Sequence, residues 1–256
     1  MTLRSTTMAL LGALLAIPLF AAEEPLRVFL RCGEKTHNPV GNGEHDYPAF
    51  LGEWAKILQE RGVRVDGALH FPTAAELERT DVLVIYAGDG GNLGADERTI
   101  LEAYLGRGGG LVVLHDGMCS NDPRSFARLA GAAKQHGEMN WSRGPLRLRV
   151  VDPEQPITKG MADFTMDDEA FFLLRRTPEM RVLLEAPLPT SGVVEPQAWA
   201  RETALAGGKT YRAFVWMQGH YTPKLLEPTA RGLVLRGIAW AGFRPVSELL
   251  VPVPAD

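Results

Sequence analysis

The segment Gly109-Gly110-Leu111-Val112-Val113-Leu114-His115-Asp116-Gly117 decides the fold of this chain. Its apolar run is short, follows glycines and ends at His115-Asp116-Gly117, which predicts a buried parallel strand with an imidazole at its carboxyl end. Open α/β sheets bind their ligands at the carboxyl ends of the strands. His115 is therefore our first candidate for a functional residue.

Strands and helices alternate upstream of this segment. Stretches rich in β-forming residues lie at 26–32, 63–69 and 81–87, and stretches with helical spacing or helix boundaries lie at 50–58, 73–79 and 95–105. Alternation at these lengths predicts βαβ units, and hence a parallel sheet with helices on both faces. We expect an α/β fold with three layers, αβα.

The pattern changes after about residue 144. Further β-rich pieces lie at 145–151, 181–186 and 213–217, and a helix is expected at 229–241. We interpret this half as the far side of the same, mainly parallel sheet plus a small antiparallel extension. A chain of 256 residues, 45% of them hydrophobic, suits one domain with a substantial core.

The first 22 residues differ from the rest. Arg4 is followed by an apolar stretch from Met8 to Phe20, and Ala21-Ala22 precede acidic residues, which predicts a signal peptide cleaved near Ala22. The stretch is too short for a comfortable membrane span. We expect a signal peptide at 1–22, one domain at 25–246 and a C-terminal tail at 247–256, in a periplasmic or secreted protein without a membrane anchor after cleavage.

Charge and local motifs narrow the ligand class. The formal net charge is −4 without a long basic run, so we expect no nucleic-acid partner and favour a small polar ligand. The loop Gly88-Asp89-Gly90-Gly91-Asn92-Leu93-Gly94 departs from the dinucleotide fingerprint because Leu93 replaces its last glycine, so NAD is not expected. Asp89 is a candidate ligand contact, with turn formation as the alternative.

A nucleophile is not apparent in the expected place. His115 stands where hydrolases expose serine or cysteine on a nucleophile elbow, and no Gly-x-Ser-x-Gly or Gly-x-Cys-x-Gly occurs there. Cys119, four residues on, is the last-ranked alternative, which predicts inactivation by thiol reagents. Cys32 and Cys119 could pair with each other or remain as two unpaired thiols.

Other histidines lie in similar settings. His37, His45, His136 and His220 also occur where an element gives way to a loop, whereas His70 reads as an ordinary strand-end residue. Imidazoles brought together with a carboxylate can bind a divalent transition metal or act as general acid and base. Because no His-Glu-x-x-His motif is present, the fold itself would have to assemble metal ligands.

Asp167-Asp168-Glu169 is flanked by phenylalanines. Either at least one of these carboxylates is drawn inward by its apolar neighbours, or the acids form a solvated turn and helix cap. The sequence leaves both interpretations open.

The chain resembles the ThuA-like family, named for trehalose utilisation. The resemblance is carried by His45-Asp46, 108–115, 131–136, Pro156-Ile157-Thr158-Lys159-Gly160 with Asp168-Glu169, 214–220 and Arg236-Gly237-Ile238-Ala239-Trp240. It implies a flavodoxin-like, class I glutamine amidotransferase-like domain that lacks the amidotransferase cysteine, and a role in carbohydrate metabolism. Two departures, Ala170 where the family often has an aromatic residue and Lys209-Thr210-Tyr211-Arg212 in place of a Gly-Arg pair, concern the ligand more than the fold.

Our first hypothesis is an exported enzyme that acts on a sugar, glycoside or keto sugar by acid-base or metal-assisted chemistry. The candidate catalytic residues are His45, His115, His136, Glu169 and His220, and the candidate ligand-binding residues are Asp46, Asp89, Asp116, Trp141 and Asp168. The alternative is a non-catalytic sugar-binding or assembly module, in which Trp141 and Trp199 would stack on sugar rings.

Overall fold

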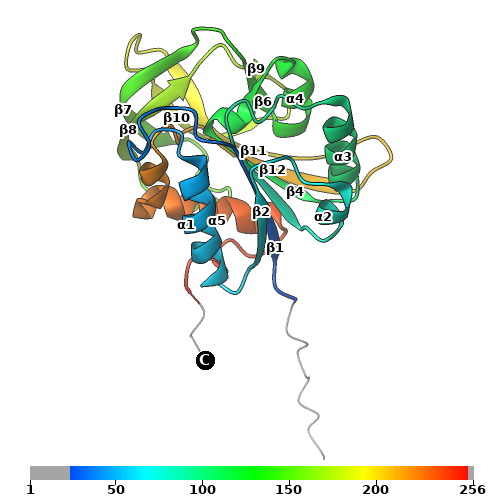
Figure 1. Ribbon diagram of the computed structural model, residues 1–256. Coiled ribbons are helices and arrows are strands. Elements are labelled where there is room, and N and C mark those ends of the chain that lie inside the picture. The colour runs from blue at the N-terminus through cyan, green and yellow to red at the C-terminus, as the bar shows by residue number, and fades with distance from the viewer. Residues whose placement is uncertain (1–23, 253–256) are drawn as a thin grey trace, which may run out of the picture.

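The computed structural model describes residues 24–252, and its centre is a nine-stranded sheet (Figure 1). The strand order is β2-β1-β3-β4-β12-β11-β10-β7-β8. The parallel half consists of β1 (Arg27–Cys32), β2 (Arg64–Ala68), β3 (Val82–Tyr86), β4 (Gly110–Leu114) and β12 (Thr210–Trp216). The antiparallel half consists of β7 (Trp141–Val150), β8 (Phe164–Phe171), β10 (Arg181–Pro187) and β11 (Val194–Ala204).

The α/β class and the parallel core expected from the sequence are confirmed, but the antiparallel part is larger than a small extension. Its strands β8 and β11 were not anticipated. Acidic residues are uncommon in strands, so the Asp167-Asp168-Glu169 run hid the β-character of β8. Pairing with β7 along eight positions gives this segment its strand conformation.

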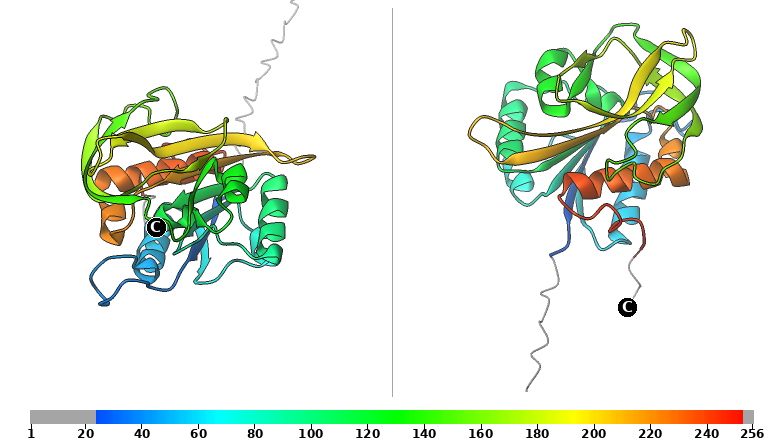
Figure 2. Two further views of the ribbon diagram at one scale, coloured as in Figure 1. Left: turned by 90° about the horizontal axis from the view of Figure 1, so that it is seen from above. Right: turned by 180° about the vertical axis from the view of Figure 1, so that it is seen from behind.

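Helices cover both faces of the sheet (Figure 2). One face packs against α1 (Tyr47–Gln59), α5 (Pro228–Ala241) and the 3₁₀ helix η2 (Thr222–Leu226). The other face packs against α2 (Ala74–Glu78), α3 (Ala95–Gly106) and α4 (Pro123–Ala130). Beside α4 lies a small sheet of β5 (Cys119–Ser120), β6 (Ala132–Gln135) and β9 (Arg175–Arg176), and η1 (His115–Met118) follows β4.

The core explains why the parallel strands are apolar along their whole length. Every residue of β3 and of β4 is buried, as burial on both faces of a parallel sheet requires. Trp54 from α1 and Phe214 from β12 are fully buried with them. In residues 24–252 no helix is both long and apolar enough to cross a bilayer.

The expected domain limits can be compared with the structure only at the C-terminal end of the chain. The predicted signal peptide lies outside the described residues. The beginning of the expected C-terminal tail packs on the domain, since Leu249 is buried and its carbonyl oxygen accepts a hydrogen bond of 2.8 Å from Nε of Arg61.

Strand order fixes where a ligand can bind. The parallel strands follow the flavodoxin-like pattern, in which the order reverses between β1 and β3. Ligands of such sheets bind beyond the carboxyl ends of the strands at this switch point. The loops that follow β1, β3, β4 and β12 all begin at this edge.

Candidate functional site

Backbone hydrogen bonds join the loop after β1 to the loop after β12. The amide of His45 donates to the carbonyl of His220 at 2.9 Å, and the amide of Thr222 donates to the carbonyl of Gly43 at 2.8 Å. Tyr86, at the end of β3, donates its hydroxyl hydrogen bond to the carbonyl of Gly219. Segments far apart in the sequence are thereby held side by side at the carboxyl edge of the sheet.

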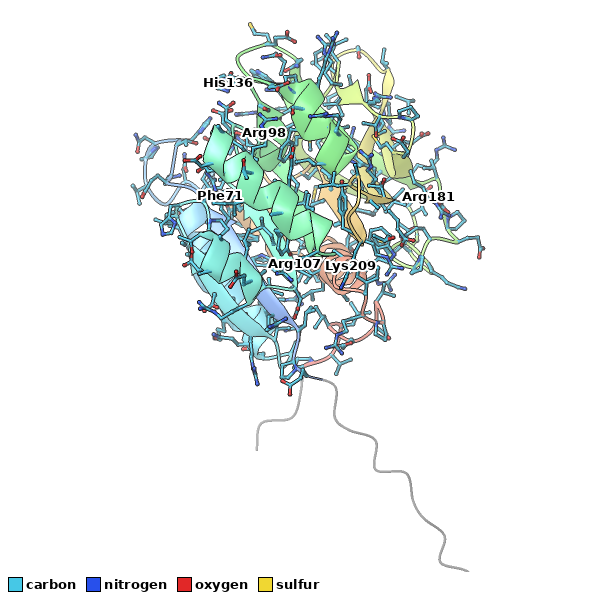
Figure 3. All side chains as sticks on the ribbon, turned by 90° about the vertical axis from the view of Figure 1, so that its right-hand side faces the viewer. Phe71, Arg98, Arg107, His136, Arg181 and Lys209 are labelled. Atoms are coloured by element: carbon cyan, nitrogen blue, oxygen red, sulfur yellow. The ribbon has the colours of Figure 1, made fainter. Side chains whose placement is uncertain are left out.

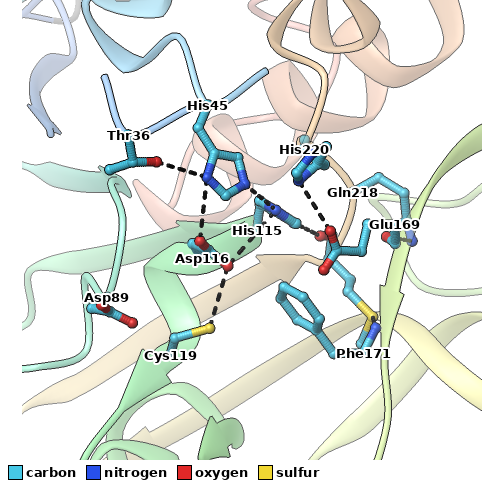
Figure 4. A network of polar contacts seen from close by, with 12 residues as sticks. Thr36, His45, Asp89, His115, Asp116, Cys119, Glu169, Phe171, Gln218 and His220 are labelled. Atoms are coloured by element: carbon cyan, nitrogen blue, oxygen red, sulfur yellow. Dashed lines mark hydrogen bonds and ion pairs between the residues drawn. The ribbon is translucent and has the colours of Figure 1, made fainter. Parts of the chain in front are cut away.

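Three of the candidate histidines converge there (Figure 4). The ring centroids of His45 and His220 are 4.4 Å apart, those of His45 and His115 5.1 Å, and those of His115 and His220 5.6 Å. All three side chains are buried. His37, which lies nearer the surface, packs its ring against His45 at 4.1 Å. We call His45, His115 and His220 the histidine cluster.

The tautomer of His115 follows from its surroundings. Nδ1 of His115 lies 2.9 Å from the carbonyl oxygen of Met217, so it carries the proton and donates. Nε2 is then the acceptor nitrogen of the ring, and it lies 3.0 Å from Nε2 of His45, within hydrogen-bond distance. The ring of Phe171 stacks on His115 at 4.9 Å and fixes its plane.

His45 is held neutral. Its Nδ1 lies 3.0 Å from Oγ1 of Thr36 and 3.6 Å from Oδ2 of Asp116. Burial lowers the pKa of His45, and the neighbouring His115 and His220 lower it further. A neutral imidazole can accept a proton or bind a metal ion.

His220 lacks hydrogen bonds. Neither of its ring nitrogens has a hydrogen-bond partner in the described chain, although the side chain is only 1% exposed. Nδ1 lies 3.0 Å from Oε2 of Glu169, outside hydrogen-bond geometry, and Nε2 lies 3.6 Å from Oε1 of Glu44. Buried polar atoms in native proteins usually have hydrogen-bond partners, so this imidazole is a candidate to bind a ligand.

Glu169 provides the buried carboxylate of the site. Burial raises its pKa, but His220, His115 and Arg143 outweigh this effect and lower the pKa to about 2. Nε of Arg143 donates to Oε2 of Glu169 at 3.2 Å, and Arg143 also lies 3.6 Å from Glu44. Sequence reasoning missed Arg143 and Glu44. Arg143 is the residue directly opposite Glu169 in the β7–β8 ladder, a relation that becomes visible only once that pairing is known.

Asp168 holds the loop that carries His220. Its carboxylate oxygens accept hydrogen bonds from the amides of Gly219 at 3.2 Å, His220 at 3.1 Å and Glu169 at 2.6 Å. Asp168 is fully buried, and burial raises its pKa despite the nearby histidines and amides. Its oxygens face backbone amides, so the carboxylate positions the loop.

Two members of the histidine cluster, and Asp89, have strained backbone conformations. His45, His115 and Asp89 have φ values of 43°, 48° and 51°, in the left-handed region that non-glycine residues rarely adopt. Such residues cost about 1–3 kcal/mol each and tend to occur at functional sites.

Comparison with known proteins identifies the family and the fold of this chain. The family model described as ThuA, trehalose utilisation, matches residues 38–241, which is well over half of the chain. The chain belongs to the ThuA family. None of the curated proteins compared with it matches.

Solved structures of ThuA-like proteins share the fold. A ThuA-like protein from Parabacteroides merdae superposes with a TM-score of 0.64 at 18% identity, covering 91% of this chain and 94% of that one. A ThuA-like protein from Bacteroides uniformis gives 0.61 at 19% identity, covering 90% and 95%. A cytoplasmic protein from Salmonella typhimurium gives 0.52 at 15% identity, covering 85% and 97%. The ThuA domain thus has the glutamine amidotransferase-like α/β fold inferred from the sequence.

Two other candidates of this ThuA-family chain pair with each other. His136 contacts Asp89 through Nδ1 and Oδ1, and both side chains are partly exposed. His136 lies at the molecular surface (Figure 3). In the described part of the chain no hydrogen bond or ion pair links this pair to the histidine cluster. The structure therefore places His136 outside the cluster.

The remaining candidates are distributed as follows. Asp116 faces His45 and contacts Sγ of Cys119 at 3.4 Å. Asp46 caps α1, accepting a hydrogen bond from the amide of Ala49, and within residues 24–252 no hydrogen bond or ion pair joins its side chain to the three rings. Trp141 is 43% exposed and lies against Arg143, whose guanidinium carbon is 5.4 Å from the ring centroid.

Trp199 is a core residue. It is fully buried, and its Nε1 donates to the carbonyl of Ala130 at 2.9 Å. Because its ring is buried, Trp199 offers no surface on which a sugar ring could stack.

The glycine-rich loop after β3 packs against the loop after β4. A Cβ on Gly91 would lie 2.9 Å from the carbonyl oxygen of Cys119, and one on Gly90 would lie 2.8 Å from Cα of Gly117. Close packing of two loops explains these glycines without a phosphate. Cys32 and Cys119 are both free and buried.

Proposed function

We propose that this ThuA-family protein is an exported enzyme of carbohydrate utilisation, with its reaction centre at the histidine cluster. One observation carries the proposal: three buried imidazoles and the carboxylate of Glu169 meet at the carboxyl edge of the sheet. Structural histidines in a core normally have hydrogen bonds, whereas in the described chain Nε2 of His220 has none and its Nδ1 lies 3.0 Å from the carboxylate of Glu169.

The arrangement supports proton transfer. Nδ1 of His115 donates to the carbonyl of Met217, so Nε2 is the acceptor nitrogen of the ring, and it faces Nε2 of His45 at 3.0 Å. Such a nitrogen can take a proton from a sugar hydroxyl or from a carbon next to a keto group. The ionised Glu169 stabilises positive charge on the neighbouring His220.

Two observations support a sugar as the substrate. The family description names trehalose utilisation. Trp141 adds an exposed ring beside the charged Arg143 at the rim of the site, and an aromatic face next to hydrogen-bond donors suits a sugar ring. We favour glycosides and their keto derivatives. Export rests on the leader-like sequence of residues 1–22.

A substrate panel tests the proposal. The purified protein is incubated with trehalose, other disaccharides, simple glycosides and the corresponding keto sugars, and products are followed by NMR and mass spectrometry. We expect conversion of at least one member. Binding detected by calorimetry without any product would instead support the non-catalytic sugar-binding module. A protein that neither binds nor converts any member of the panel would contradict a carbohydrate role.

A further inference from the structure

We propose that His115, His220 and Glu169 bind one divalent first-row transition metal ion, with His45 as a fourth ligand. The inference rests on the proposed function for its biological role, because it names what the same site holds. Its test needs no substrate.

The donor atoms are already gathered. One ligand atom from each of His115, Glu169 and His220 lies within 4.8 Å of the other two, and all three residues are buried. Two ligands of one zinc ion, each bonded at about 2.1 Å, can be at most about 4.2 Å apart. Small side-chain rotations therefore bring these atoms into a common coordination sphere.

His115 and His45 have the second contacts that metal-bound histidines have. A ligating imidazole usually passes its other ring nitrogen to a backbone carbonyl or polar side chain, which fixes the tautomer. Nδ1 of His115 contacts the carbonyl of Met217 and Nδ1 of His45 contacts the hydroxyl of Thr36. Their Nε2 atoms then face each other at 3.0 Å, so an ion bound to one is within reach of the other.

His220 supplies the independent observation. Both of its ring nitrogens are buried and lack hydrogen-bond partners, and its backbone is held by Asp168. A buried nitrogen without a hydrogen bond is unfavourable, and coordination to a metal ion removes that cost. The ion pair of Nδ1 with Glu169 at 3.0 Å leaves Nε2 without a hydrogen-bond partner in the described chain.

The donor set selects the metal class. Imidazole nitrogens suit zinc, iron, nickel and copper, whereas magnesium and calcium prefer oxygen ligands. Histidines together with one carboxylate occur as ligands of zinc and of non-haem iron. Two overlapping groups, His37 with His45 and His220, and His45 with His115 and Asp116, each include a less buried residue. The fully buried group is the one we assign.

Metal content tests the assignment. Tag-free protein is dialysed against zinc or cobalt and then against metal-free buffer, and bound metal is measured by inductively coupled plasma mass spectrometry. We expect about one equivalent in the wild type and less than about a tenth in His220→Ala and Glu169→Gln. The control is His70→Ala, which removes an exposed histidine and retains the metal. Circular dichroism shows whether each variant is folded.

X-ray absorption of the wild type provides a test that no misfolded variant can obscure. We expect scattering from imidazole rings with a first shell near about 2.0–2.1 Å for zinc. A wild type that retains no zinc or cobalt, a spectrum without imidazole scattering, or variants that bind like the wild type would overturn the assignment. A metal-loaded protein that converts no sugar would contradict the proposed function and leave the metal site standing.

Discussion

Nε2 of His45 and Nε2 of His115 lie 3.0 Å apart, although 70 positions separate the two residues in the chain. Two imidazole nitrogens this close must share a proton or bind a common ion, because two lone pairs, or two N–H groups, would repel each other. Nδ1 of His115 already donates to Met217, so without an ion the shared proton belongs to His45. The pair is thus poised for proton transfer or metal binding.

Asp168→Asn tests whether this carboxylate holds the loop of His220. The amide side chain has one acceptor oxygen where the carboxylate has two, so we expect the free energy of unfolding to fall by about 1–3 kcal/mol. Urea denaturation measures this change. Asp167→Asn, which alters an exposed neighbour on the same strand, is the matched control and should change stability by less than about 0.5 kcal/mol. Equal effects of the two variants would remove the positioning role.

Trp141 and Trp199 should respond in opposite ways to truncation. Trp199→Ala removes a fully buried ring and is expected to cost about 3–5 kcal/mol in unfolding free energy. Trp141→Ala should change stability by no more than about 0.5 kcal/mol but weaken sugar binding in calorimetry, since its exposed ring borders the site. Unchanged sugar affinity in Trp141→Ala would exclude that ring as a binding surface.

The buried thiols should be inert in the native protein. Burial raises the pKa of Cys32 to about 12, and burial followed by the charge of Asp116 raises the pKa of Cys119. Because the thiolate is the reactive form, iodoacetamide at neutral pH should label neither residue until the protein is unfolded. Peptide mass spectrometry measures the labelling. Rapid native labelling of Cys119 with loss of turnover would revive the cysteine-dependent hydrolase.

The stability contributed by Asp81 should depend on pH. Burial raises the pKa of Asp81, but the hydrogen bonds and charge of Arg27 prevail and lower it, so the folded pKa lies below the unfolded value. The stabilisation is therefore full above about pH 3.9 and disappears as pH falls through the lower folded pKa. Since the pair is partly exposed, we expect Asp81→Asn to lose only about 1 kcal/mol at pH 7. A difference from wild type in urea melts that persists well below pH 3 would contradict this explanation.

The parallel half of the fold and the three histidines of the cluster could be predicted from local sequence. Apolar runs that end in His115 and His220 identify buried strands, and parallel strands place their carboxyl ends at one edge. His136 shows the same local pattern but follows β6, which belongs to the small second sheet. Its contact with Asp89 instead of the cluster depends on strand pairing, which no local pattern reveals.

The antiparallel half could not be predicted in the same way. Arg143 meets Glu169 only because β7 pairs with β8 in one particular register. The role of Asp168 depends on burial beneath the loop of His220, and acidic residues on a buried strand run against β-propensity. The positions of these charged residues in the site therefore depend on pairing between strands that are distant in the sequence.

The most direct test of the histidine cluster as the reaction centre is kcat/KM of His115→Ala and His220→Ala on the first sugar that the wild type converts. We predict a loss of at least about 10²-fold in each, as expected when a proton-transferring or metal-binding group is removed, with His70→Ala within about twofold of wild type. Folded His115→Ala and His220→Ala proteins that turn over this sugar as fast as the wild type would contradict the assignment.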